Sequence, residues 1–140
     1  MQEAYERAPL HATTLELIWQ WFHRVIAVYC LLFGLLYWVR LIGYYDDPLW
    51  RFDLMPAYWQ VASVSLAVLF PFAAIGLWGL ASWGPVIWFV CAAAETVMYA
   101  GFPELFGSRL PIVFSHGLVL LLYVSLRVTL YMERRRAQAK

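Results

Sequence analysis

The chain has 140 residues, of which 64% are hydrophobic, 19% are aromatic and only 14% are charged. Soluble domains carry roughly 25% charged residues, so this composition excludes an ordinary soluble protein and indicates an integral membrane protein. The formal net charge is +1, and the basic residues gather at one end instead of forming a mixed basic and aromatic patch, which argues against nucleic-acid binding.

The first apolar stretch runs from about residue 21 to residue 42, long enough for the roughly 20 residues that a membrane-spanning helix needs. The preceding Thr13 and Glu16 match a capping box, in which both side chains satisfy first-turn amides. The helix is therefore expected to begin before the apolar stretch. Because the stretch starts late, has full span length and is followed by no small-residue cleavage site, we expect it to be retained rather than removed as a signal peptide.

The connection GYYDDPLWRFDLMPAYW follows, and it mixes aromatic and charged residues. Asp46, Asp47 and Asp53 surround Arg51 in this segment. Calcium loops require several oxygen ligands at fixed spacing with a turn glycine among them, an arrangement that the segment lacks, so no metal site is predicted here. We expect the connection to lie in the membrane interface, with Arg51 paired to Asp47 or Asp53.

The second and third apolar stretches cover about residues 59–80 and 85–102, with a tight turn at 81–84 between them. Pro71 lies in the middle of the second stretch. Proline removes one backbone hydrogen bond and frees the carbonyl four residues earlier, here that of Ala67, so a kink is predicted.

The fourth stretch covers about residues 110–131 and ends in the basic tail MERRRAQAK. Basic residues in short flanks are retained in the cytoplasm, and most of them lie on the side shared by both termini, which we therefore predict to be cytoplasmic. That side carries Arg7, Arg24, Arg127, Arg134, Arg135, Arg136 and Lys140, and the other carries Arg40, Arg51 and Arg109. We interpret the tail as a topology signal rather than a docking site, although it could attract anionic headgroups.

Five of these arginines are predicted to act as membrane-interface anchors: Arg24, Arg127, Arg134, Arg135 and Arg136. Long basic side chains near a helix end can reach the interface at modest cost. Small residues mark the expected close contacts between helices, namely Gly34, Ala73, Ala74, Gly76, Ala92, Ala93, Ala94 and Gly117. Both cysteines, Cys30 and Cys91, lie inside apolar stretches and are predicted to be core residues.

Three segments carry a family resemblance: WFHRVIAVYCLLFGLLYWVRLIG, WRFDLMPAYWQ and AAIGLWGLASWGPVIWF. The sequence resembles a family of small uncharacterised inner-membrane proteins from alphaproteobacteria, catalogued as a domain of unknown function, over about residues 19–127. The resemblance implies a bacterial inner-membrane protein with four helices and supplies no catalytic residues. On size and topology alone the chain also resembles the DoxX-like four-helix membrane proteins, a likeness that establishes no function.

Glu95 lies about ten residues into the third stretch, near the middle of a hydrocarbon core about 30 Å thick. Ionisable residues at such depth are candidates for functional sites. Tyr99 and His116 are expected at similar depth and form the predicted polar cluster with Glu95. Burial should favour the neutral carboxyl, which would donate to a carbonyl such as that of Ala67 or share a proton with His116. His23 is expected in the opposite leaflet from His116, which argues against a haem held between the two.

No nucleophile motif, phosphate loop or dinucleotide fingerprint is present, so we predict neither an enzyme nor a cofactor. The expected architecture is all-α, an integral membrane four-helix bundle forming a single domain over residues 1–140. Two functional hypotheses remain. The favoured one is an accessory or assembly subunit that interacts with other membrane proteins or forms a homo-oligomer. The alternative is a binding or transport module in which Glu95, Tyr99 and His116 receive a proton, cation, quinone or small polar solute.

Overall fold

The computed structural model describes residues 12–140. Its elements are α2 (Thr14–Ile42), the 3-10 helix η1 (Phe52–Leu54), α3 (Ala57–Trp78), α4 (Gly84–Thr96), the π-helix η2 (Val97–Gly101), α5 (Pro103–Phe106) and α6 (Leu110–Gln138). This part of the chain is all-helical, and four of its helices, with α4 and η2 taken as one, are long and apolar enough to cross a membrane. These four overlap the predicted spans, and both α2 and α6 extend beyond them.

Helix α2 begins and ends as its sequence dictates. The Thr13 side chain accepts from the amide of Glu16, and the Glu16 side chain accepts from the amide of Thr13, so the predicted capping box is present. The helix ends at Gly43, whose φ of 69° lies in the left-handed region. A glycine is favoured there because it adopts this conformation without the steric cost of a Cβ. A Cβ at Gly43 would also lie 3.3 Å from Cγ of Arg51.

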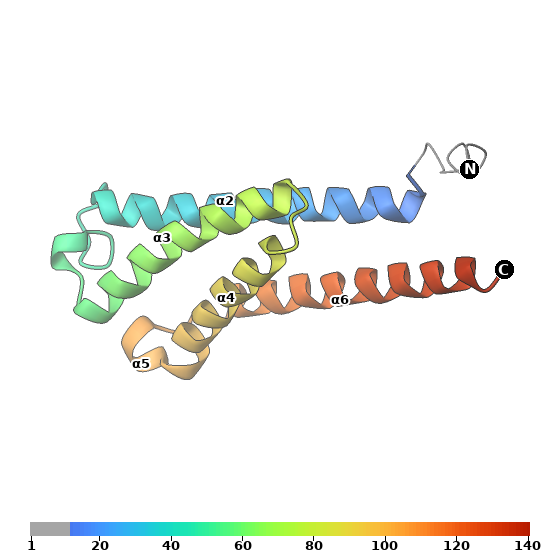
Figure 1. The fold of residues 1–140 in the computed structure, drawn as a ribbon. Helices are drawn as coiled ribbons and strands as arrows, with labels where there is room; N and C mark the ends of the chain where they lie inside the picture. Colours follow the sequence, from blue (N-terminus) through green and yellow to red (C-terminus); the bar gives the residue numbers. More distant parts are fainter. Residues whose placement is uncertain (1–11) are drawn as a thin grey trace.

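Helices α2, α3 and α4 form the packed part of the bundle. Helix α3 returns alongside α2, α4 turns back along α3, and α6 lies along α4 (Figure 1). Three glycines allow the closest contacts. A Cβ at Gly34 would lie 2.9 Å from Cδ of Pro71, one at Gly76 would lie 2.7 Å from the Cα of Gly84, and one at Gly84 would lie 2.5 Å from the carbonyl carbon of Gly76. Backbones can approach this closely only where side chains are small.

Pro71 lies inside α3, which continues past it. The structure corrects one expectation about its neighbourhood, because the carbonyl of Ala67 accepts a hydrogen bond from the indole Nε1 of Trp38 at 3.0 Å and not from Glu95. A carbonyl released by proline inside lipid needs such a donor. The side chain that supplies it comes from the neighbouring helix α2.

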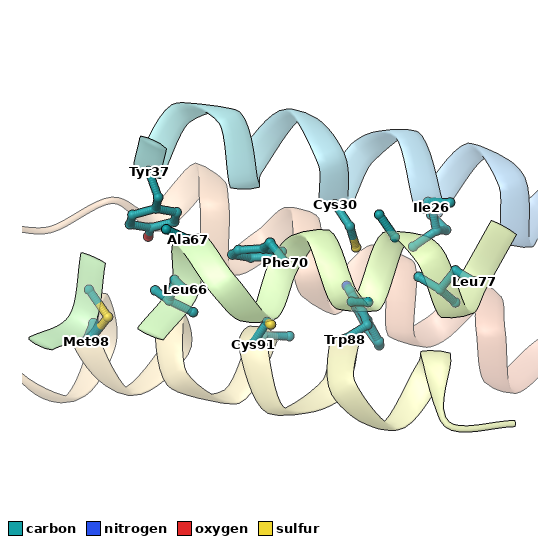
Figure 2. Close-up of a cluster of buried hydrophobic side chains, with 14 of the residues drawn as sticks. Ile26, Cys30, Tyr37, Leu66, Ala67, Phe70, Leu77, Trp88, Cys91 and Met98 are labelled. Atoms are coloured by element: carbon teal, nitrogen blue, oxygen red, sulfur yellow. The ribbon is translucent and has the colours of Figure 1, made fainter. Parts of the chain in front are cut away.

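The core is built almost entirely from α2, α3 and α4 (Figure 2). Both cysteines are fully buried and free, as predicted for core residues. Helix α6 is different: only 11% of its most apolar stretch is buried, against 33% to 44% for the other three spans. A Cβ placed on Gly117 of α6 would meet nothing within 4 Å among residues 12–140, so the close contact expected there is absent. Ala93 is likewise exposed.

Ion pairs and aromatic contacts stabilise the connection between α2 and α3. Arg51 pairs with Asp53 at 2.8 Å and with Asp46 at 3.3 Å. The Asp53 partner was one of the two expected, whereas Asp47 instead accepts from the backbone amide of Leu49. The connection thus forms its own ion pairs at the end of the bundle opposite to the start of α2 and the end of α6.

Candidate functional site

Glu95 on α4 is completely buried, and each of its carboxyl oxygens has a hydrogen-bond partner. The hydroxyl of Tyr37 on α2 donates to Oε1 at 2.5 Å, and Nε2 of His116 on α6 lies 2.5 Å from Oε2. Tyr37 and His116 are each only 3% exposed. Isolated charges at this depth would be costly, so the pairing accounts for the presence of a carboxyl group inside the bundle.

The hydrogen bonds continue from His116 toward the edge of the bundle. The hydroxyl of Tyr29 lies 3.2 Å from Nδ1 of His116 and 2.7 Å from the hydroxyl of Ser115. Ser115 in turn donates to the carbonyl of Ile112 at 2.7 Å. Tyr29 and Ser115 are half-buried, so this end of the chain of polar groups lies closer to the surface than Glu95 does.

The donors and acceptors in this series of hydrogen bonds assign a hydrogen to Nδ1 of His116. Ser115 uses its only hydrogen on the carbonyl of Ile112, so Tyr29 must donate to Ser115. Tyr29 then has no hydrogen left for His116, and Nδ1 must donate to Tyr29. The contact between Nε2 and Oε2 therefore holds one further proton, either on the imidazole beside a carboxylate or on the carboxyl beside a neutral imidazole. Both arrangements leave the buried pair without net charge.

Tyr99 joins the cluster through Tyr37 and not through Glu95 directly. The two tyrosine hydroxyls are 3.4 Å apart, which is long for an O–H···O hydrogen bond. Because Tyr37 already donates to Glu95, Tyr99 is the donor to Tyr37. Tyr99 belongs to the π-helix η2, and such segments inside α-helices occur frequently at functional sites.

The structure thus brings the three predicted cluster residues, Glu95, Tyr99 and His116, into one network. It adds two residues that sequence analysis did not select, Tyr29 and Tyr37, which supply the donors on either side of the pair. Their signal in the sequence is weak. They recur eight residues apart, about two helical turns, and Phe33 is the only other aromatic residue between them.

The network lies apart from the larger cavities of the described residues. Cavities of about 180 to 760 Å³ occur among residues 12–140, and five of them have linings that do not include Glu95, His116, Tyr99 or Tyr37. The largest is an apolar groove between α3 and α4, which Ala94 and Met98 line from the side of α4.

The predicted anchors occupy different environments. Arg24 is half-buried between the rings of Trp21 and Trp78, at 5.5 and 5.6 Å, and its Nε has no hydrogen-bond partner within residues 12–140. Arg127, Arg134, Arg135 and Arg136 are exposed on the last turns of α6. Arg7, counted for the orientation, lies outside the described residues. The anchoring role of these arginines stays a prediction.

Arg40 is a site residue that sequence analysis missed, since it was counted only as a flanking charge. It is 3% exposed. Its guanidinium lies over the rings of Trp50 at 4.2 Å, Trp59 at 5.0 Å and Tyr37 at 5.9 Å, and donates to the carbonyl of Leu49. Trp50 reaches Arg40 only because the connection folds back onto α2. No local sequence pattern predicts this contact.

Comparison with known proteins confirms one part of the resemblance noted from the sequence, the membership of a family of unknown function. The family of unknown function DUF6163 matches residues 17–134. Neither the curated proteins nor the solved structures contain a match. The chain therefore belongs to the DUF6163 family, and the family brings no assigned activity or ligand to the site.

Proposed function

We propose that this protein is a non-enzymatic, multi-pass subunit of the bacterial inner membrane that assists or assembles with other membrane proteins. The single observation that carries the proposal is the uncovered state of α6. Only 11% of the residues in its apolar stretch are buried, so one of the four candidate spanning helices leaves most of its apolar residues at least partly exposed to lipid or to a partner. Leu118, Leu121, Val124 and Val128 are among the large apolar side chains exposed on it.

The polar cluster supports the same proposal. Both oxygens of Glu95 are paired, and neither Glu95 nor His116 lines any of the five cavities described above. A satisfied polar contact in a low-dielectric interior fixes the register of the helices that supply it. Glu95, Tyr37 and His116 come from three helices, so the contact would hold α6 against α2 and α4 along one side and leave the other side free.

Site-specific photocrosslinking tests the proposal. A photoreactive residue would replace Leu121 on α6, which is 64% exposed, and, as a matched control, Leu32 on α2, which is 56% exposed. We expect position 121, but not position 32, to crosslink to a membrane protein that also co-purifies in mild detergent. Crosslinks to lipid alone from both positions would contradict a partner, and protein crosslinks from position 32 alone would place the partner on α2.

A second candidate function rests on a specific observation, the continuous series of polar groups from Tyr99 through Tyr37, Glu95 and His116 to Tyr29. Such a series could carry a proton, and the π-helix η2 next to Glu95 is the kind of irregularity that functional sites use. Glu95→Gln separates the two functions, because glutamine preserves shape and hydrogen bonding but cannot ionise. An unchanged cellular phenotype would eliminate the proton site, and a null phenotype in a stable protein would favour it.

The proposed orientation places the start of α2, the turn at Ser82 and the end of α6 in the cytoplasm. The distribution of basic residues supports it. Cysteine labelling at Ser82 and at the C-terminus from the cytoplasmic side, and at Asp46 and Ser108 from the outside, tests it. An outward C-terminal tail would overturn the orientation.

A further inference from the structure

A cavity of about 520 Å³ opens at the end of the bundle where α2 begins and α6 ends. Both helices extend beyond the turn that joins α3 to α4, so this turn is set back from the start of α2 and the end of α6 (Figure 1). The cavity is lined by Trp19 and His23 of α2, Ser82 and Pro85 near the turn, and Tyr123 and Arg127 of α6. The rings of Trp19 and Tyr123 lie 5.3 Å apart.

Among residues 12–140 the cationic groups at this cavity have no carboxylate counter-ion. A neighbouring cavity of about 180 Å³ shares Trp19 and Arg127 and is also lined by Arg134. Arg127 and Arg134 are seven residues apart, about two turns, and so lie on the same face of α6. Among residues 12–140 no carboxylate lies within 4.0 Å of either guanidinium, and Arg127 makes only a 3.5 Å contact to the hydroxyl of Tyr123.

An apolar groove leads away from the same cavity. It measures about 230 Å³ and shares Pro85, Val86 and Tyr123 with the cavity of about 520 Å³. From there it continues between α4 and α6 past Phe89 and Leu120. The two arginines, the indole and the phenol at the end of the bundle match the polar head of an amphiphilic molecule. The apolar groove between α4 and α6 matches its apolar tail.

We propose that this is a binding site for an anionic glycerophospholipid. Its phosphate lies between Arg127 and Arg134, which suit the oxygens of a phosphate better than ammonium groups would. Trp19 and Tyr123 lie at headgroup level, where amphipathic rings are favoured. One acyl chain follows the groove between α4 and α6. The groove is what selects a lipid over inorganic phosphate, since the free ion would gain nothing from it.

Native mass spectrometry of the full chain in mild detergent tests the site. Phosphatidylglycerol would be titrated against Arg127→Gln/Arg134→Gln and against the matched control Arg135→Gln/Arg136→Gln, which removes the same charge from the same helix outside both cavities. We expect wild type and control to bind equally and the first variant to bind roughly tenfold more weakly, a difference of about 1.4 kcal/mol. An equal loss in both variants would show general attraction by the basic tail and overturn the site.

A second variant separates lipid from free phosphate. Val86 is 61% exposed and lines the groove, so Val86→Trp should obstruct the acyl chain without disturbing the fold. We expect it to weaken phosphatidylglycerol binding severalfold while phosphatidylcholine of the same chains binds weakly throughout. If Val86→Trp has no effect and inorganic phosphate at millimolar concentration displaces the lipid, the site is a phosphate site and the lipid proposal fails.

Discussion

Glu95 and Arg40 are both ionisable side chains almost completely removed from the surface, yet the fold accommodates them by different means. Glu95 lies inside the bundle and has a directional partner for each oxygen, supplied by α2 and α6. Arg40 lies three residues before the cap of α2 and is surrounded by aromatic faces, with one hydrogen bond to a backbone carbonyl. A carboxylate concentrates its charge on two oxygens, whereas a guanidinium is delocalised, weakly hydrated and able to stack.

The difference indicates how strongly the stability of each site depends on exact atom positions. Hydrogen bonds to Glu95 depend on atom positions, so a change at any partner leaves a buried polar atom unpaired, which is expensive. The attraction between a cation and a ring face varies slowly with position, and its magnitude is about 0.5–2 kcal/mol. Substitutions at Glu95 should therefore cost more than substitutions at Arg40.

The largest effect is expected for Glu95→Leu. Leucine leaves His116 and Tyr37 without their acceptor, and breaking a buried pair in this way costs about 3–5 kcal/mol. Cys30 and Cys91 are the only cysteines in the chain and both are buried, so reaction with a maleimide dye that fluoresces on coupling reports unfolding without further engineering.

Glu95→Gln supplies the shape-matched comparison. Because Nδ1 of His116 carries a hydrogen, its Nε2 can accept from the glutamine amide, and Tyr37 can still donate to the glutamine oxygen. We expect Gln to cost less than half of what Leu costs, and Glu104→Leu, at an exposed position on α5, to cost little. Equal losses for Leu and Gln would mean that the ionised pair, not its hydrogen bonds, holds the helices.

Tyr37→Phe should have an intermediate effect, and it tests the residue that touches both regions. Phenylalanine keeps the ring that faces Arg40 and stacks on Phe70 but removes the hydrogen bond to Glu95. An unpaired buried acceptor costs about 1–3 kcal/mol. Tyr58→Phe, on an exposed tyrosine of α3, is the control in the same maleimide assay. If the two variants unfold alike, the short contact between Tyr37 and Glu95 contributes nothing to stability.

The four helices that are long and apolar enough to cross a membrane, and the capping box, could be predicted because they depend on local features, namely apolar length and the spacing of Thr13 and Glu16. Glu95 could also be selected, since a carboxyl group inside an apolar stretch is recognisable from the sequence alone, however the chain folds. Tyr37 and Arg40 could not be selected in the same way. A tyrosine on a spanning helix and an arginine near its end are ordinary residues there, and their roles arise only from the neighbours that tertiary packing supplies.

The uncovered state of α6 could not be predicted either. Its hydropathy resembles that of the other spans, and hydropathy alone does not distinguish a surface that faces lipid from one that faces protein, because both environments are apolar. The expected contact at Gly117 illustrates this. Glycine permits a close approach, but a neighbouring helix has to be present to make it, and in residues 12–140 none lies beside Gly117.

The smallest effect is expected for Arg40→Lys, which keeps the charge and tests whether stacking is what holds the cation. Lysine offers a compact ammonium in place of a planar group, so it should lose most of the contact with Trp50 and Trp59 and the hydrogen bond to Leu49. We expect a loss of about 1 kcal/mol. Arg51→Lys is the matched control, since its partners Asp46 and Asp53 are exposed and surface pairs contribute only about 0–1 kcal/mol. A loss at Arg40 no larger than that at Arg51 would show that charge alone suffices near the end of α2. A loss as large as that of Glu95→Leu would show instead that the arginine is as narrowly specified as the glutamate, and the contrast between hydrogen-bonded and stacked groups would have to be abandoned.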